Sequence, residues 1–239
     1  MTHCPCDTTT LVRFWKSFFI HQFLEVYLHT LKKDEQTFLR AVATDGHRLS
    51  RVETILPNEA DELEGIILPR KTVTEVRKLT EDKTGNVSVQ ISNTRIQFNL
   101  GGVVLTSKLL DGTFPDYNRV ILEGNNKKLT LETNLFAEAV DRVSIVSNDR
   151  SRAVKLALKQ DALIVSADSP EQGSANEEIT AEYNGESIDI GFNSKYVLDV
   201  ARQIEGGKTE LLLADSVSPT ILTDVDDPRV LYVLMPMRV

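Results

Sequence analysis

The sequence predicts an α+β fold built from a repeated strand–helix–strands unit, with helices on one face of antiparallel sheets. Short runs rich in β-branched residues alternate polar and apolar positions, as half-buried strands do. Turn signals containing Gly, Asp or Asn separate these runs, and three longer segments carry apolar residues at helical spacing instead. The same order of segments recurs along the chain, which indicates a pseudo-symmetric assembly.

The composition is that of a globular protein, with 41% hydrophobic and 26% charged residues in 239. This length suits two domains of ordinary size. No apolar run reaches the roughly eighteen residues of a membrane span. The net charge of -8 argues against general adhesion to nucleic acid or anionic lipid, but it leaves room for a local basic surface.

Residues 1–26 form an atypical N-terminal segment. Cys4 and Cys6 are the only cysteines, and with His3 they fall short of the four ligands of a zinc site. We therefore interpret them as free thiols in an N-terminal tail, which suits a reducing cytoplasm.

The rest of this segment is rich in aromatic residues. It faintly resembles a signal peptide, but Lys16 and His21 interrupt the apolar run and no small-residue cleavage site follows. An apolar stripe at helical spacing predicts a helix that caps the next domain, and a poorly ordered leader is the alternative. The stripe consists of Leu11, Phe14, Trp15, Phe18, Phe19 and Phe23.

Three copies of the repeated unit follow. Each begins with a strand, continues through a polar cap into an amphipathic helix, and ends in further strands. The copies span 65–102, 127–168 and 186–224, with helices at roughly 69–81, 134–147 and 194–204. Runs outside the copies, "FLRAVAT" at 38–44 and "LYVLMPMRV" at 231–239, also read as strands. The polar segment 123–128 predicts a boundary between a domain at 27–124 and another at 125–239.

Two of the predicted helices are basic on the face opposite their apolar stripe. In the first, Val73, Val76 and Leu79 form the stripe, and Arg70, Lys71, Arg77 and Lys78 lie opposite. In the third, Val197, Val200, Ala201 and Ile204 form the stripe, and Lys195 and Arg202 project away from it. Equivalent positions in the repeat predict one pooled positive surface. Ordinary solvated faces are the alternative, favoured by the middle helix, where Glu138 and Asp141 accompany Arg142.

No pattern of catalytic residues is present. The sequence has no GxSxG, no GxxxxGK[ST], and no GxGxxG after a strand. Its four histidines, at 3, 21, 29 and 47, have no metal-ligating partner at i+3 or i+4. We therefore expect no catalytic residue, no metal and no cofactor.

The stretch "RAVATDGHRLSRVE", residues 40–53, places His47 and Arg48 after an Asp45-Gly46 turn between two strand-like runs. On its own an Asp-Gly pair is typical of a type I′ hairpin turn. The same exposed polar residues are also typical of a ligand-binding loop.

Three motifs that follow one another along the chain decide between a plain hairpin turn and a ligand-binding loop. They are "ATDGHRL" at 43–49, "TSKLLDGTFPDYNRV" at 106–120 and "YVLMPMRV" at 232–239. Together they resemble the bacterial DNA polymerase III β subunit family, the sliding clamps, and the resemblance covers residues 27–239. It implies the DNA-clamp fold: three similar domains per chain, and two chains closed into a homodimeric ring around double-stranded DNA. Helices line the bore, so Arg70, Lys71, Arg77, Lys78, Lys195 and Arg202 are expected to face DNA without reading its sequence.

The resemblance also implies a groove that binds short linear peptides. Its expected partners are the DNA polymerase III catalytic subunit, the clamp loader, repair polymerases and mismatch-repair proteins, in the bacterial cytoplasm at the nucleoid. Apolar groups would hold a Leu or Phe anchor, methionines would adapt to different partners, and arginines would meet peptide carbonyls or acidic side chains. The implied groove residues are Thr44, Gly46, His47, Arg48, Leu49, Pro115, Arg119, Val120, Tyr196, Val233, Met235, Pro236, Met237 and Arg238.

The sequence also departs from the family pattern. It has no counterpart of the first domain or of the start of the second, so closure of the usual ring is doubtful. Phe23 stands where the family has a groove-lining leucine, and Pro219 replaces a small polar residue. One hypothesis keeps the groove and some DNA affinity without the usual ring, and another gives a non-standard oligomer capped by the N-terminal segment. An interaction scaffold that binds peptides without encircling DNA is the alternative function.

Overall fold

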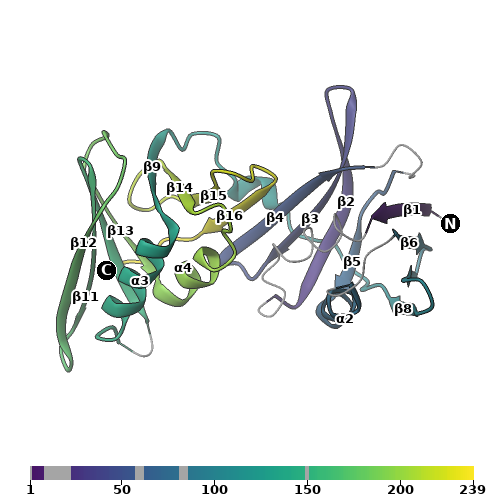
Figure 1. Cartoon of the computed structure of the whole chain (residues 1–239), viewed down its shortest axis with the longest axis horizontal. Helices are drawn as coiled ribbons and strands as arrows, with labels where there is room; N and C mark the ends of the chain where they lie inside the picture. Colours follow the sequence, from purple (N-terminus) through teal and green to yellow (C-terminus); the bar gives the residue numbers. More distant parts are fainter. Residues whose placement is uncertain (1, 8–22, 57–61, 81–85, 149–150) are drawn as a thin grey trace. The chain divides into compact units, whose positions relative to one another are not determined.

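The computed structural model describes residues 2–7, 23–56, 62–80, 86–148 and 151–239. The chain divides into two compact units, Met1–Pro115 (unit 1) and Asp116–Val239 (unit 2). Both combine antiparallel sheets with helices, so the predicted α+β class is confirmed (Figure 1). The division falls before the segment 123–128 that the sequence indicated. Asn125 of that segment is buried, and its amide donates to the carbonyls of Leu212 at 3.0 Å and Pro219 at 2.9 Å, both in unit 2.

Unit 1 contains two antiparallel sheets and helix α2. One sheet has the order β5-β2-β3-β4, and the other has the order β1-β6-β7-β8. Apolar side chains from both sheets and from α2, including Leu68, Val76, Ile96 and Phe98, are almost fully buried and form the core. The elements are β1 (Thr2–Asp7), β2 (Glu25–Lys33), β3 (Gln36–Thr44), β4 (Arg48–Ile55), β5 (Ile66–Pro69), α2 (Arg70–Thr80), β6 (Asn86–Ile91), β7 (Arg95–Asn99) and β8 (Val104–Lys108).

Strand β1 corrects the expectation of an N-terminal tail. Thr2–Asp7 pairs antiparallel with β6, so that Cys4 lies opposite Val89 and Cys6 opposite Val87. A sheet edge has unpaired backbone groups, and β1 satisfies those of β6. The predicted capping helix and its alternative, a poorly ordered leader, fall largely on 8–22, outside the described residues. Phe23 is described, and it is buried.

Unit 2 also has two antiparallel sheets, in the orders β12-β11-β10-β13 and β16-β15-β14-β9. Its core contains Leu129, Phe136, Leu156 and Phe192, all buried. Its elements are η1 (Tyr117–Val120), β9 (Lys127–Glu132), α3 (Thr133–Ser144), β10 (Ala153–Lys159), β11 (Ala162–Ser169), β12 (Gly173–Thr180), β13 (Ile188–Asn193), α4 (Ser194–Ala201), β14 (Lys208–Leu213), β15 (Thr220–Asp224) and β16 (Val230–Leu234).

The strand pairing shows the predicted repeat directly. In unit 2 each copy gives its first strand to the sheet of the other copy, because β9 pairs with β14 and β13 pairs with β10. Unit 1 follows the same rule, since β5 pairs with β2 and β1 pairs with β6. Strand β1 therefore occupies, on β6, the position that β9 occupies on β14.

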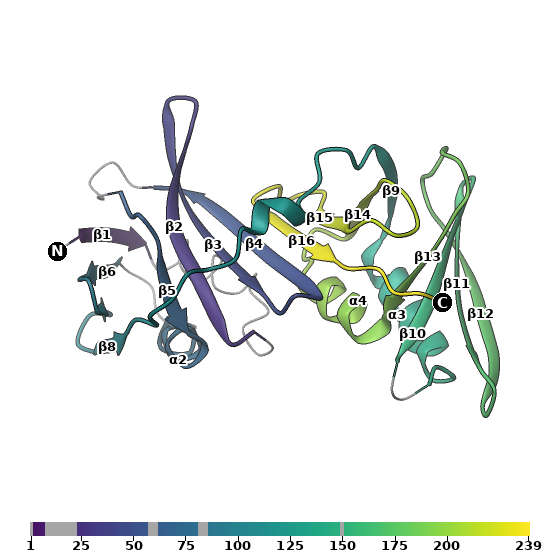
Figure 2. The same cartoon turned by 180° about the vertical axis from the view of Figure 1, so that it is seen from behind.

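The three predicted helices are present and begin within one residue of their expected starts. The apolar stripes are buried as expected, including Val73 and Val76 in α2 and Val197 and Val200 in α4. Helix α3 packs against the sheet that contains β10, β11 and β12, and α4 lies beside it (Figures 1 and 2). Among the described residues, no helix combines the length and the apolar character needed to cross a bilayer.

Candidate peptide-binding groove and basic helix faces

The β3–β4 hairpin is held in shape by the side chains at its tip. Asp45 Oδ1 accepts hydrogen bonds from the amides of His47 and Arg48, both at 3.0 Å. The Thr44 hydroxyl donates to the Arg48 carbonyl at 2.9 Å. Gly46 has a φ of +82°, whereas Asp45 does not adopt a positive φ, so the turn is not type I′. The resulting tip exposes Gly46 and His47.

Arg48 is buried and paired at the hairpin tip. It is only 5% exposed, its Nε donates to Asp45 Oδ2 at 3.1 Å, and its guanidinium lies 5.4 Å from the centre of the Phe23 ring. Leu49 is buried as well. Arg48 and the backbone of His47 are therefore both bonded to Asp45.

An aromatic stack at the end of unit 1 fixes the position of Pro115. Phe114 stacks on Tyr27 with ring centroids 5.0 Å apart, and Tyr27 stacks on His29 at 4.9 Å. Burial lowers the pKa of His29, which favours the neutral ring. Pro115 follows the stack and is exposed. Sequence reasoning did not single out Tyr27 or Phe114, because their partnership joins residues far apart in the chain.

The remaining predicted groove residues lie in unit 2. Arg119 and Val120 belong to η1, where Arg119 is exposed and its Nε donates to Asp116 Oδ2 at 3.0 Å. Tyr196 lies on α4 and is half-buried. Val233 lies in β16 and is almost completely buried. The residues predicted for the groove therefore belong to both units.

The C-terminal tail leaves the sheet at Leu234. It was predicted to continue the last strand, but β16 ends there, and Pro236 has no N–H to donate to a ladder. The Met237 amide donates instead to the Gly191 carbonyl in β13 at 2.9 Å. Figure 2 shows the tail running from β16 toward β13. Met235, Pro236 and Met237 are thereby half-buried, and Arg238 is exposed.

The basic helix residues are mostly exposed, each within its own unit. On α2, Arg70, Lys71 and Lys78 are exposed and Arg77 is half-buried, with Lys78 paired to Glu75 at 3.3 Å. On α4, Lys195 is exposed, and Arg202 is exposed at its C-cap. The α3 residue Arg142 is neutralised, because it pairs with Glu177 at 2.5 Å and with Glu138 at 3.3 Å.

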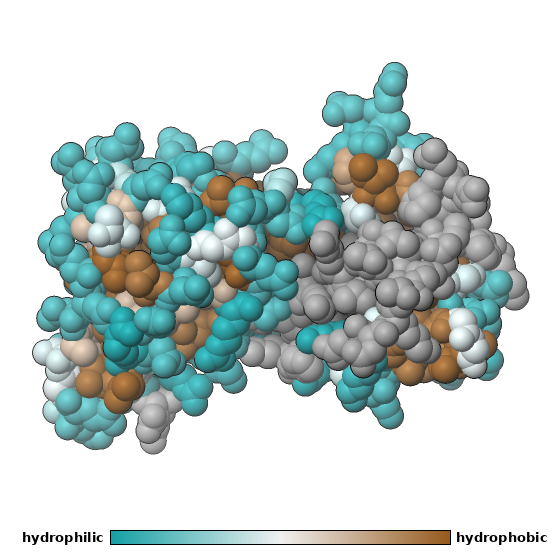
Figure 3. All heavy atoms as spheres, in the orientation of Figure 1, coloured by the Kyte–Doolittle hydropathy of each residue, from teal (hydrophilic) through white to brown (hydrophobic). Residues whose placement is uncertain are grey.

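Among the described residues no group of His, Cys, Asp and Glu could hold a metal ion. The visible face of unit 2 is mainly hydrophilic, with apolar atoms in small separate patches (Figure 3).

Two units, each with helices and paired antiparallel sheets that exchange their first strands, define a protein of the DNA-clamp class. Family models match in the same order: the central domain of the DNA polymerase III beta subunit over residues 26–116, and its C-terminal domain over residues 118–238. The chain belongs to the DNA polymerase III beta subunit family.

Curated relatives agree with this assignment. The chain is 48% identical over 214 residues to the beta sliding clamp of Caulobacter vibrioides, covering 90% of this chain and 58% of that protein. It is 40% identical over 200 residues to the beta sliding clamp of Pseudomonas putida, covering 84% of this chain and 54% of that protein. The chain thus spans just over half the length of these relatives.

Solved structures agree as well. A Caulobacter crescentus beta sliding clamp with PEG bound to a putative beta-motif tethering region has a TM-score of 0.92 and 43% identity, covering 99% of this chain and 66% of that one. A Bartonella birtlesii sliding clamp bound to griselimycin also has a TM-score of 0.92, with 42% identity, covering 100% of this chain and 66% of that one. The fold predicted from the sequence resemblance is therefore confirmed.

Proposed function

We propose that this chain works as a sliding clamp, a processivity factor that tethers a replicative polymerase and repair proteins to double-stranded DNA. Its role is binding, without catalysis, and its place is the bacterial cytoplasm at the nucleoid. Contact with DNA would use the phosphate backbone, which carries charge but no sequence information. The six basic residues of α2 and α4 named above would supply this contact.

The second half of the proposal is a groove for short linear peptides. Pro115 and Val120 supply accessible apolar surface for a Leu or Phe anchor, the buried Leu49 and Val233 would support that surface, and Met235 and Met237 can adapt to different partners. The exposed His47 and Arg238 can meet peptide carbonyls or acidic side chains. The expected partners are the DNA polymerase III catalytic subunit, the clamp loader, repair polymerases and mismatch-repair proteins. Two related clamps give partial support: one is described as bound to griselimycin, and another holds PEG at a putative beta-motif tethering region.

One observation carries this proposal. The hairpin "TDGHRL" and the tail "MPMRV" are each held by specific local bonds, through Asp45 and through Gly191, in a chain that matches two clamp domains in order. Segments held in this way are pre-organised for binding.

A labelled peptide tests the groove. Fluorescence polarisation should show saturable binding of a fluorescein-labelled peptide that carries a clamp-binding motif with Leu and Phe anchors. Removal of residues 235–239 should abolish the binding while the thermal unfolding transition persists. A folded full-length chain that binds no such peptide would contradict the proposal.

The mass in solution tests encirclement. Sedimentation equilibrium gives the oligomeric state, and a closed ring should be retained on circular DNA and lost from the same DNA after linearisation. A monomer cannot be linked topologically to DNA. Peptide binding by a monomer with no preference for circular DNA would favour the alternative, an interaction scaffold, which also suits the net charge of -8.

A further inference from the structure

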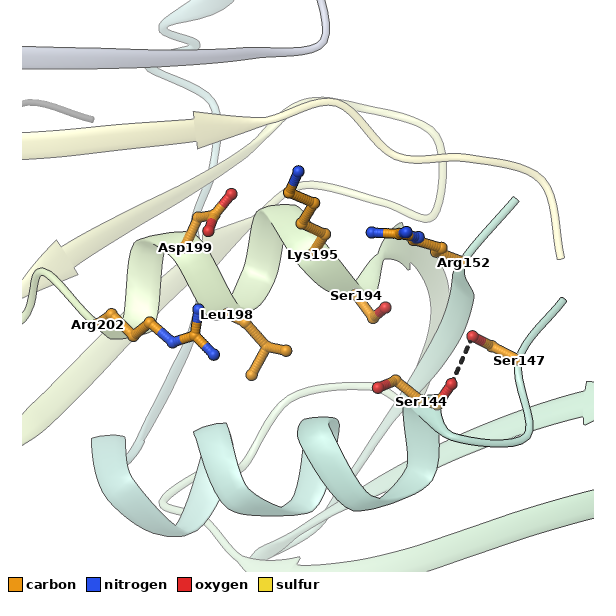
Figure 4. Close-up of a pocket in the computed structure, with 8 residues that line it drawn as sticks. All are labelled: Ser144, Ser147, Arg152, Ser194, Lys195, Leu198, Asp199 and Arg202. Carbon is orange, nitrogen blue, oxygen red and sulfur yellow. Dashed lines mark hydrogen bonds between the residues drawn. The ribbon is translucent and has the colours of Figure 1, made fainter. Parts of the chain in front are cut away.

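A cavity of about 250 Å³ lies between α3 and α4 in unit 2. We call it the α3–α4 cavity; its lining side chains are shown in Figure 4. The lining residues are Ser144, Ser147, Arg152, Ser194, Lys195, Leu198, Asp199 and Arg202. Six of them, Ser144, Ser147, Arg152, Ser194, Leu198 and Asp199, were not singled out from the sequence.

The cavity is rich in positive charge that the described residues do not neutralise. Arg152, Lys195 and Arg202 all line it and are exposed. Across the described ranges none of the three forms an ion pair, in contrast to Arg142 of α3, which pairs with Glu138 and Glu177. Asp199 is the single carboxylate of the lining. Figure 4 shows Asp199 and Lys195 on the same side of α4, turned away from α3.

Ser194 supplies a hydrogen-bond donor directed into the cavity. Its side chain is buried at 4% exposure, and its hydroxyl has no hydrogen-bond partner within the described part of the chain. The other two hydroxyls are already used, because Ser147 Oγ donates to the Ser144 carbonyl at 2.7 Å and Ser144 Oγ donates to the Asp141 carbonyl at 2.8 Å. The Ser194 hydroxyl faces the cavity and can donate a hydrogen bond to an oxyanion there.

Arg152 is held beside Ser194 by the backbone. Its φ is +49°, a left-handed conformation that is uncommon for a residue with a side chain. Its carbonyl accepts a hydrogen bond from the Ser194 amide at 2.8 Å, and its own amide donates to the Asn148 carbonyl at 2.7 Å. These bonds hold the backbone of Arg152 beside that of Ser194, and both residues line the cavity.

We propose that the α3–α4 cavity binds phosphate groups of a nucleic-acid backbone, with Ser194 and Arg152 at one end and Arg202 at the other. The planar guanidinium fits phosphate oxygens well, and charge-assisted bonds of this kind are strong. Arg202 lies eight residues after Ser194, about 12 Å along the helix at 1.5 Å per residue. One strand carries a phosphate about every 3.4 Å of its axis. Donors at both ends therefore suit a run of phosphates better than one free ion.

This inference rests on the proposed DNA-binding function and makes it more specific. Beyond a diffuse basic face, it assigns unit 2 a shaped phosphate site with a neutral donor, Ser194. A shaped site should respond to the loss of one hydroxyl, whereas a diffuse field responds only to charge. That difference separates the two ideas by experiment.

Amide chemical shifts of the ¹⁵N-labelled full chain test the site. Inorganic phosphate, compared with chloride at equal ionic strength, should shift the amides of Arg152, Ser194 and Lys195 in a saturable way, and a short DNA duplex should shift the same amides. Arg152→Gln and Ser194→Ala should each weaken both ligands about tenfold, the factor that corresponds to about 1.4 kcal/mol. Two matched controls, Arg142→Gln and Ser174→Ala, should leave both affinities unchanged.

Three other outcomes would contradict the proposed phosphate site or change its ligand. Equal DNA affinity in wild type, Arg152→Gln and Ser194→Ala would overturn this inference and leave the proposed function intact. Saturable phosphate shifts without any DNA shifts would assign the site to free phosphate and overturn the backbone source. If a variant fails to fold, judged by its amide dispersion, the wild-type titrations still decide, because phosphate shifts no larger than those of chloride exclude the site.

Discussion

Met237 and Gly191 are joined by a hydrogen bond of 2.9 Å, and a side chain at position 191 would have no room. A Cβ there would lie 2.6 Å from the Met237 carbonyl oxygen and 2.5 Å from Val239 Cγ1. The C-terminal tail thus lies against β13 because residue 191 has no side chain. The anchoring of the proposed groove depends on this contact.

Gly191→Ala should release the tail. Because the Cβ meets a backbone oxygen, we expect about 1–3 kcal/mol of overpacking strain or displacement of the tail. Peptide affinity should then fall about tenfold or more, measured by fluorescence polarisation alongside thermal unfolding. Gly124→Ala is the matched control, since a Cβ at Gly124 has no neighbour within 4 Å. Wild-type peptide affinity in Gly191→Ala would mean that the tail has no part in the groove.

Asp45→Ala should destabilise unit 1 and disorder the hairpin tip. The change removes the acceptor for two backbone amides and leaves the buried Arg48 without this carboxylate. We expect a loss of about 2–4 kcal/mol in the free energy of unfolding, measured by urea denaturation. Asp111→Ala, at an exposed position, should cost less than about 0.5 kcal/mol. Equal losses in the two variants would refute this role of Asp45.

Glu53 should make the stability of unit 1 depend on acidic pH. Burial alone raises the pKa of Glu53, but Arg51, Arg40 and Lys33 outweigh it, so the net shift is downward from 4.5. The carboxylate contacts Arg40 Nη2 at 2.5 Å and Lys33 Nζ at 3.2 Å. A lowered pKa gives stability that is present above pH 4.5 and lost as pH falls through the folded-state value.

Glu53→Gln should therefore lower stability at pH 7 by about 2–4 kcal/mol, since Arg40 is buried and loses its charged partner. Between about pH 5 and pH 3, where carboxyl groups titrate, the free energy of unfolding of this variant should fall less steeply than that of the wild type. Urea denaturation at each pH measures it. Glu62→Gln is the control, because its pair with Lys32 is exposed and should contribute about 0–1 kcal/mol. An unchanged acid slope in Glu53→Gln would contradict the assignment.

Tyr232 should make the stability of the folded chain depend on alkaline pH. Burial, reinforced by Asp224, Asp227 and Glu205, raises the pKa of this phenol far above its usual value of 10.0. The unfolded chain can ionise above about pH 10 while the folded chain cannot, so stability should fall as pH rises past that point. Tyr232→Phe should reduce this alkaline loss and cost about 1 kcal/mol at pH 7, measured by urea denaturation. A wild-type alkaline slope in the variant would count against the prediction.

The sequence predicted the helices well because their apolar residues recur at a period that only a helix places on one face. Val73 and Val76 in α2, and Val197 and Val200 in α4, are buried as this periodicity requires. Strand β12 was not predicted, because "GSANEEIT" is polar and carries little of the β-branched pattern. Its place is decided by pairing with β11 over its whole length.

In the candidate site, too, some features could be predicted from the sequence and others depend on the tertiary structure. The Asp45-Gly46 turn could be predicted from two residues, and the exposure of His47 follows from it. The buried ion pair of Arg48 with Asp45, the Tyr27–Phe114 stack and the bond between Met237 and Gly191 could not. Each depends on how side chains and backbone lie in three dimensions, which no periodicity encodes.

Local patterns, which act over a few residues, were enough to establish the α+β class, the three strand–helix–strands copies and the family. Folding alone decided that β1 completes a sheet, that the tail leaves β16 for β13, and that Arg152 and Ser194 lie beside each other at one cavity. The physical reason is range. Periodicity and turn chemistry are local, whereas strand exchange, burial and hydrogen-bond partners join residues tens of positions apart.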